Sequence, residues 1–174
     1  MVDKKDLPVL DKDVFLCCDP GSGGTGFALF SKQKLFPLNT HVVSPPQNIK
    51  QWATAKRLVL LGVEDYLEDL RDRGCQQLYI EKPQFMDTHV GITAARSDNL
   101  LKLIVIYSCI GLLAERLGYV VKDVKIPTWK GQLDKRKVSF RLEKILGATF
   151  PDHIADAVGI GLFLKGKFTI QQKD

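Results

Sequence analysis

Three acidic residues of this chain each stand next to a short apolar stretch. Asp19 follows the apolar residues Val14–Cys18 and opens a glycine-rich turn. Glu81 ends the short stretch that begins at Leu78, and Asp156 lies in an apolar segment near the end of the sequence. An ionised carboxylate at the mouth of a buried strand is costly unless a cation or hydrogen-bond donors receive it. We therefore interpret these three acids as candidate metal ligands.

A histidine accompanies the third acid. His153 and Asp156 are three residues apart, so they share one face if this segment is helical. His153 is a candidate for a fourth metal ligand or for a residue that orients a water. Alternatively, it is only a surface residue in the first turn of a helix. Asp152 competes for the fourth position, but its place after Pro151 favours a helix N-cap.

The residue types select the metal and the chemistry. Carboxylate oxygens prefer hard ions, so the sequence predicts Mg²⁺ with Mn²⁺ as a substitute, and no Cys/His cluster has spacing suited to zinc. Two such ions about 3.5–4 Å apart activate water and stabilise the leaving oxygen in phosphodiester cleavage. Mutual repulsion is also expected to raise the pKa of at least one of the acids while no metal is bound.

The elements that must position these residues predict an α/β domain with a mixed sheet and helices on its faces. Apolar runs punctuated by glycine and proline predict strands, and helical spacing of apolar residues predicts long helices. In chain order the predicted elements are strands over Val14–Asp19, Thr25–Phe30 and Lys34–Val43, a helix over Ile49–Arg73, the Glu81 strand, an apolar helix ending near Gly118, a strand over Tyr119–Ile126, a basic segment over Lys130–Lys144 and a final helix with Asp156.

Length and composition indicate one globular domain. The chain has 174 residues, of which 45% are hydrophobic, and we expect residues 13–168 to form the domain between a flexible leader, 1–12, and a polar tail, 169–174. The formal net charge of +5 favours a polyanionic partner. Four cysteines without CxxC spacing are typical of small core residues in a reducing compartment.

Nothing in the sequence predicts a membrane partner. The charged N-terminal stretch lacks the apolar run of a signal peptide, and the apolar stretch Leu100–Leu113 contains Lys102 and is too short to span a bilayer. We expect a cytoplasmic protein of a bacterium or of a phage-infected cell, with an organelle as the alternative. The residues Leu103, Ile106, Ile110 and Leu113 favour a core helix over a partner surface, although a dimer would need to bury a face of this helix or of the preceding one.

Three stretches, in order along the chain, resemble the RuvC-type Holliday-junction resolvases, which have an RNase H-like fold. The stretches are Asp19-Pro20-Gly21-Ser22 through Thr25-Gly26-Phe27, the strand end Ile80-Glu81, and His153-Ile154-Ala155-Asp156-Ala157. The resemblance implies a mixed sheet of three antiparallel strands followed by parallel strands. It implies that Asp19, Glu81 and Asp156 are the metal-binding carboxylates and that His153 occupies a position filled in the family by Asp or His. A homodimer that nicks opposite strands of a four-way DNA junction is implied as well.

A basic segment follows the last predicted strand. Its residues are Lys130, Lys135, Arg136, Lys137, Arg141 and Lys144, and most such runs are solvated helix faces. Lys130 and Lys135 resemble lysines that the family keeps near the scissile phosphate, where a cation stabilises developing charge and Lys135 would join the catalytic residues. The resemblance therefore favours DNA contacts for the segment. Phe85 is either buried or stacks on an opened base at the junction centre.

The chain departs from the family pattern in three places. Its leader is longer than in typical bacterial members, the loop between Lys130 and Lys135 is shorter, and Phe85 lies one residue later after the strand acid than the junction-probing aromatic of the family. These departures suit a phage-encoded or divergent member. Each acid also has an ordinary alternative role: Asp19 as a turn cap, Glu81 as a salt-bridge partner of Lys82, and Asp156 as a solvated helix residue.

The prediction from sequence is a metal-dependent, structure-selective endodeoxyribonuclease that resolves four-way junctions by paired nicks through metal-activated water, with no nucleotide cofactor. The alternative within the same chemistry is an RNase H-like nuclease that acts on other branched or RNA-containing substrates. A non-catalytic junction-binding module is a further alternative. An ATP-binding protein of the actin and sugar-kinase type also uses a glycine-rich hairpin after Asp, but it normally needs a second domain.

Overall fold

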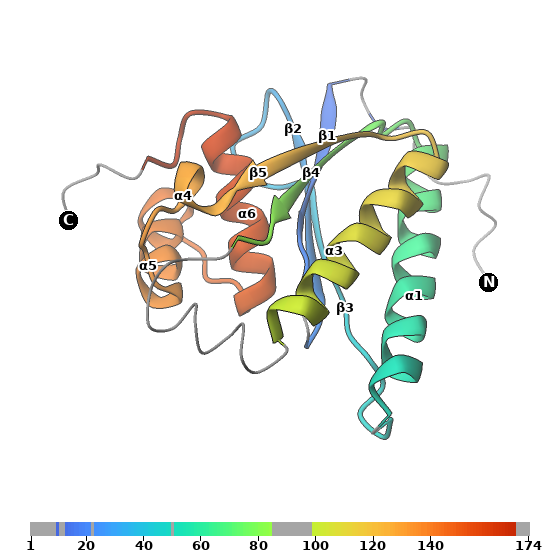
Figure 1. The fold of residues 1–174 in the computed structure, drawn as a ribbon. Helices are drawn as coiled ribbons and strands as arrows, with labels where there is room; N and C mark the ends of the chain where they lie inside the picture. The colour runs from blue at the N-terminus through green and yellow to red at the C-terminus, as the bar shows by residue number, and fades with distance from the viewer. Residues whose placement is uncertain (1–9, 11–12, 22, 50, 85–98, 170–174) are drawn as a thin grey trace.

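The structure is a computed structural model that describes residue 10 and residues 13–21, 23–49, 51–84 and 99–169 of the chain. Within these residues the strands form a five-stranded sheet in the order β3-β2-β1-β4-β5 (Figure 1). The strands are β1 (Val14–Asp19), β2 (Thr25–Ser31), β3 (Asn39–Val43), β4 (Gln77–Lys82) and β5 (Val120–Lys125). β1, β2 and β3 pair antiparallel, whereas β4 is parallel to both β1 and β5. This is the mixed sheet that the sequence predicts.

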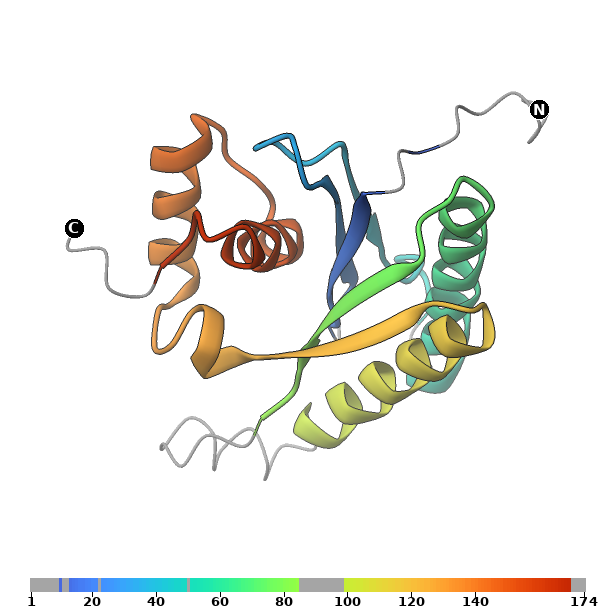
Figure 2. The same ribbon diagram turned by 90° about the horizontal axis from the view of Figure 1, so that it is seen from above.

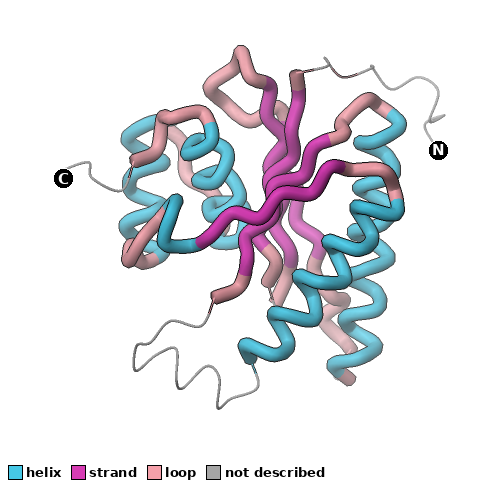
Figure 3. The backbone as a smooth tube through the Cα atoms, turned by 45° about the horizontal axis from the view of Figure 1, so that its top comes forward, coloured by secondary structure: helices cyan, strands magenta, loops and turns pink. Residues whose placement is uncertain are grey.

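Helices cover both faces of the sheet (Figures 1 and 2). The tube drawing shows the strands as a central layer between the helices (Figure 3). On one face lie α1 (Trp52–Asp72) and α3 (Asn99–Arg116); on the other lie α6 (Asp152–Leu164) and α5 (Lys135–Leu146), with the short α4 (Ile126–Trp129) leading into α5 from β5. Among the described residues no helix is long and apolar enough to cross a membrane.

The alternation of side chains along the strands decides which layer each residue joins. In β1, Leu16 and Cys18 join the core under α1 and α3, whereas Phe15 and Cys17 join the core under α5 and α6. Successive strand residues point to opposite faces, so the next residue after Cys18 points toward α6. That residue is Asp19, and the same alternation after Ile80 in β4 directs Glu81 to the same face. Strand periodicity therefore brings both acids under α6.

Close approach of α6 to the sheet depends on two glycines. A Cβ atom on Gly161 would lie 2.0 Å from the ring of Phe30, and one on Gly159 would lie 2.5 Å from the indole of Trp129. Both aromatic rings are fully buried, so they have little room to give way. The glycines thus set how deeply the helix that carries Asp156 sits against the sheet.

Several predicted boundaries differ from the structure. The third strand begins at Asn39, later than Lys34, and the first long helix begins at Trp52, later than Ile49. Cys17, Cys18 and Cys75 are buried free thiols, as the sequence predicts. The prediction of α3 as a core helix is half right: Ile106 and Ile110 are buried, but four apolar residues on other sides of the helix are exposed, namely Leu101, Ile104, Val105 and Leu112.

Substituting Gly161→Ala tests the close packing of α6. The added methyl group would overlap the Phe30 ring, so we expect the free energy of unfolding to fall by about 1–3 kcal/mol. Gly111→Ala is the matched control, because a Cβ at this helical position meets nothing within 4 Å, and it should raise the stability by up to about 1 kcal/mol. Urea unfolding followed by circular dichroism measures both; equal effects would contradict the packing argument.

Candidate metal and nucleic-acid site

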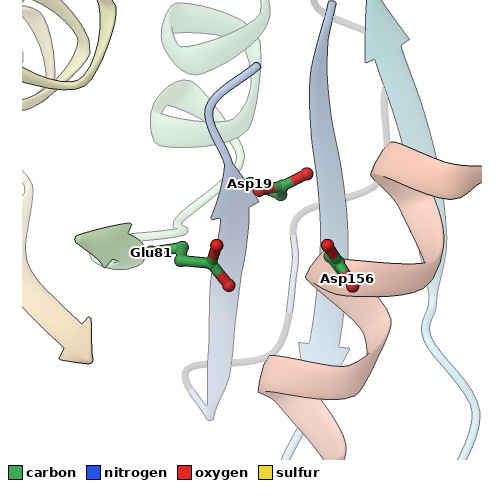
Figure 4. Close-up of side chains that lie close together, drawn as sticks. All are labelled: Asp19, Glu81 and Asp156. Carbon is green, nitrogen blue, oxygen red and sulfur yellow. The ribbon is translucent and has the colours of Figure 1, made fainter. Parts of the chain in front are cut away.

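The three predicted acids meet at one end of the sheet. Asp19, Glu81 and Asp156 each offer a carboxylate oxygen, and these oxygens lie within 4.8 Å of one another. Asp19 and Glu81 directly follow Cys18 and Ile80, which are register partners in the parallel strands β1 and β4. Asp156 comes from the first half of α6 and faces the two strand residues (Figure 4). We call these three buried residues the acidic cluster.

His153 lies beside the acidic cluster, one turn before Asp156. Its Nδ1 atom is 3.2 Å from Oδ2 of Asp19. The glycines of the β1–β2 connection make room for it: a Cβ on Gly21 would lie 2.4 Å from the imidazole ring, and one on Gly26 would lie 2.1 Å from the His153 carbonyl oxygen. The glycine-rich turn therefore accommodates the start of α6.

Two adjacent residues at the end of α4 bind the acidic cluster from the side. The indole N–H of Trp129 donates a hydrogen bond of 2.8 Å to Oε2 of Glu81, and Trp129 is fully buried. The Lys130 ammonium donates to Oδ2 of Asp156 at 2.8 Å and lies 3.5 Å from Oε2 of Glu81. Lys130 also lies over the Trp129 ring, with Nζ 4.8 Å from the ring centroid. One short turn thus supplies a neutral donor and a cation to two of the acids.

Burial makes the acidic cluster hold protons more strongly than free carboxylates do. Burial, together with the nearby Asp19 carboxylate, raises the pKa of Glu81 to about 8 against the opposing effect of Lys130. Burial also raises the pKa of Asp19, although the hydrogen bond from His153 counteracts part of this shift. This behaviour confirms the expectation that crowding raises the pKa of at least one acid.

The two cationic partners of the acids are stabilised in their charged forms. The hydrogen bond to Asp19 raises the pKa of His153 above its usual value, despite partial burial. Burial alone would lower the pKa of Lys130, but the carboxylates of Glu81 and Asp156 outweigh it and raise the pKa. The acids and these two bases therefore form one coupled group of charges.

One local prediction for the acids' neighbours is wrong, and one alternative role of Glu81 does not occur in the structure. Asp152 is not the N-cap of α6: Pro151 occupies that position, and Asp152 is the first helical residue, with its carboxylate 3.2 Å from Nζ of Lys135. A proline carries no side-chain acceptor, so the cap makes no side-chain hydrogen bond. The alternative pairing of Glu81 with Lys82 is absent from the described ion pairs, because Lys82 binds Asp123 at 2.8 Å across β4 and β5.

The predicted basic segment divides into exposed and buried residues. Lys135, Arg136, Lys137 and Lys144 are exposed on α5. Arg141 is buried, and its guanidinium donates to the carbonyl oxygen of Thr169 at 3.0 Å, so the prediction that it contacts DNA is corrected. Its spacing from Val138 and Leu142 on the apolar face of α5 is the sequence signal for this burial. Phe85 lies outside the described residues.

Sequence reasoning missed the contact of Trp129. A lone tryptophan before a lysine has no spacing that predicts a hydrogen bond to an acid 48 residues earlier. Only the pairing of β4 with β5 brings the segment after β5 to the end of β4. The tryptophan is therefore a residue whose role emerges from tertiary structure alone.

Comparison with known proteins supports the same fold. No protein-family model and no curated protein matches the sequence. The structure is similar to T. thermophilus RuvC in complex with Holliday junction substrate, with a TM-score of 0.62 and 21% identity over 86% of this chain and 90% of that chain. It is also similar to a second structure of Thermus thermophilus RuvC, with a TM-score of 0.57 and 17% identity over 90% of this chain and 98% of that chain. The chain has the RNase H-like fold of RuvC, as predicted.

The acidic cluster suits a divalent metal. Its three ligand atoms are carboxylate oxygens from rigid elements, and such oxygens are the ligands that hard cations prefer. Only two cationic groups, Lys130 and His153, contact these acids within the described residues. The three carboxylates together carry more negative charge than these two cations offset when all are ionised. A bound divalent cation would favour the ionised carboxylates and so would lower their raised pKa values.

The raised pKa of Glu81 predicts how stability depends on pH without metal. Between its ordinary pKa of 4.5 and its folded pKa of about 8, Glu81 binds more protons in the folded than in the unfolded chain. Stability contributed by its neutral form is present below this window and is lost as the pH rises through it. In EDTA, Glu81→Gln should therefore be more stable than the wild type by about 1–3 kcal/mol at about pH 8, and the difference should shrink toward about pH 5.

Urea unfolding at several pH values measures this difference. Glu115→Gln is the control, because it makes the same change at an exposed acid on α3 that is not part of the acidic cluster. If Glu81→Gln is less stable than the wild type at about pH 8, ionised Glu81 does not destabilise the folded chain and the prediction is wrong.

Proposed function

We propose that the protein is a metal-dependent endonuclease that resolves four-way DNA junctions by paired nicks. The observation that carries this proposal is the convergence of three buried carboxylates, from β1, β4 and α6, at one end of a RuvC-like sheet. One of the RuvC structures with this fold was solved with a Holliday junction substrate. A cluster of oxygen ligands beside exposed cations suits cleavage of a phosphodiester.

The acidic cluster would hold Mg²⁺, with Mn²⁺ as a substitute, and His153 is the fourth candidate ligand. Asp152 is disfavoured for this role, because its carboxylate binds Lys135 and is largely exposed. Divalent ions in such a site activate water and stabilise charge that develops on the phosphate. His153 contacts Asp19, and through its second ring nitrogen it can orient a water or accept a proton.

Basic residues near the acidic cluster support binding of a DNA backbone. The first turn of α5 contains Lys135, Arg136 and Lys137, all exposed. Cations are unfavourable at a helix N-terminus because they oppose the helix dipole, so their presence there favours a role in binding an anion. The ion pair between Lys135 and Asp152 ties this turn to the start of α6, which carries His153. This ion pair supports a role for Lys135 in contacting the scissile phosphate.

A homodimer would supply the two active sites that paired nicks require. The described part of α1 and α3 exposes an apolar groove of about 480 Å³, whose lining includes Leu61 and Leu112. These leucines are 56% and 67% exposed, which is unusual for residues in the middle of long helices. Arg57 also lines the groove, as do Glu64 and Arg116, which form an ion pair with each other, so the charged groups border an apolar centre that a second copy could cover.

Cleavage of a labelled synthetic four-way junction tests the proposed activity. With Mg²⁺ or Mn²⁺ the wild type should make symmetric nicks at the junction, and Asp156→Asn should lower the rate by at least about a hundredfold, because it removes one carboxylate from the acidic cluster. A denaturing gel resolves the products. Linear duplex and an RNA–DNA hybrid are the comparison substrates, and cutting of these as readily as of the junction would favour a broader RNase H-like nuclease.

Substituting Leu112→Glu tests the dimer. A charge in the middle of the apolar groove should weaken self-association by at least about tenfold, which sedimentation velocity measures, and should convert paired nicks into single nicks. Phe36→Glu is the matched control: Phe36 is also exposed, but it lies in the β2–β3 connection, at the opposite end of β2 from the acidic cluster. If both variants remain dimeric, the interface lies elsewhere.

A further inference from the structure

The position of Lys130 relative to the acidic cluster suggests a further role. Its ammonium lies 2.8 Å from Oδ2 of Asp156 and 3.5 Å from Oε2 of Glu81. Only 15% of its side chain is exposed, compared with 62% for Lys135. Lys130 therefore lies among the acids, whereas Lys135 lies at the surface.

The ammonium of Lys130 contacts two of the carboxylates that a metal would need. A divalent cation between Asp156 and Glu81 would draw its ligands from the same two groups. Two cations held by one pair of carboxylates at this depth repel each other strongly, because little water screens them. The ammonium and the metal therefore compete for the acids.

Lys130 has the means to move. It is the C-cap residue of α4, directly after the last helical residue Trp129, and Gly131 follows it with a positive φ of 58°. The charge of a lysine is carried on a flexible four-carbon stem, so the ammonium can leave the acids by rotation of side-chain bonds alone. The Trp129 ring, 4.8 Å from Nζ, is fixed by its burial and gives the stem an apolar and cation-binding surface along which to lie.

We propose that Lys130 is an exchangeable internal cation: it occupies the acidic cluster while no metal is bound, and a divalent metal displaces its ammonium. In the metal-free protein it supplies a positive charge to Asp156 and Glu81, beside the neutral donor that Trp129 gives to Glu81. In the metal-loaded protein the displaced ammonium is free to contact a phosphate of the DNA, so that metal binding and substrate binding are coupled. This inference rests on the proposed metal site but not on junction cleavage.

Mn²⁺ binding to the full chain tests the exchange without any nucleic acid. The free-ion electron paramagnetic resonance signal measures the dissociation constant for Mn²⁺. Lys130→Met removes the competing charge and keeps a similar length, so it should tighten Mn²⁺ binding by about tenfold or more. Lys130→Arg keeps the charge and should not tighten binding. Lys125→Met removes an exposed lysine at the end of β5 and should leave the constant unchanged.

Chemical labelling of the wild type provides a second test that does not depend on the folding of a variant. An amine-reactive ester followed by mass spectrometry should modify Lys130 slowly in EDTA and several-fold faster in saturating Mg²⁺. Lys125 should react equally in both conditions, because it is exposed and strand alternation after Val124 turns it away from the sheet face that carries Glu81.

The outcomes separate this inference from the proposed function. Unchanged or weaker Mn²⁺ binding by Lys130→Met would overturn the exchange, and so would equal labelling of Lys130 with and without Mg²⁺. In either case, junction cleavage by the wild type would leave the proposed function intact. A wild type that binds no Mn²⁺ would overturn the exchange and the metal site together. Tighter binding with metal-dependent labelling supports the exchange whatever the substrate.

Discussion

Three carboxylates that lie within 4.8 Å of one another repel each other, and burial removes most of the water that would screen them. The residues around these carboxylates reduce this repulsion by donating hydrogen bonds and positive charge to them. Trp129 donates to Glu81, Lys130 binds Asp156, and His153 contacts Asp19, so each acid has its own partner. A protein that served stability alone could replace such a group with apolar residues at little cost. Retention of the charges is therefore an argument for function that is independent of any comparison.

The fold positions these charges through ordinary periodicities. Alternation in β1 and β4 turns Asp19 and Glu81 toward α6, and the glycines at 159 and 161 let that helix approach the sheet closely. Strand pairing holds the backbones of Asp19 and Glu81, and α6 holds that of Asp156, so metal binding requires movement of the Lys130 side chain but not of the ligand backbones. Such a rigid first set of ligands is what precise metal geometry requires.

Much of this could be predicted from sequence, and the exceptions have physical reasons. The acids were predictable because each interrupts an apolar run, and such an interruption is visible without a structure. Lys130 and Arg141 were grouped as DNA contacts because a basic run looks uniform, although one binds the acids and the other is buried against Thr169. Asp152 matched the N-cap preference, but its pairing with Lys135 depends on the docking of α5 against α6, which no local pattern encodes.

The order in which the parts of the acidic cluster occur along the chain has a consequence for its synthesis. The contact between His153 and Asp19 joins residues 134 positions apart, and Asp156 follows on the same helix. While the chain emerges from a ribosome, β1 and β4 are outside long before α6, which must still cross the exit tunnel. A nascent chain therefore cannot assemble the three-carboxylate group until α6 has left the tunnel.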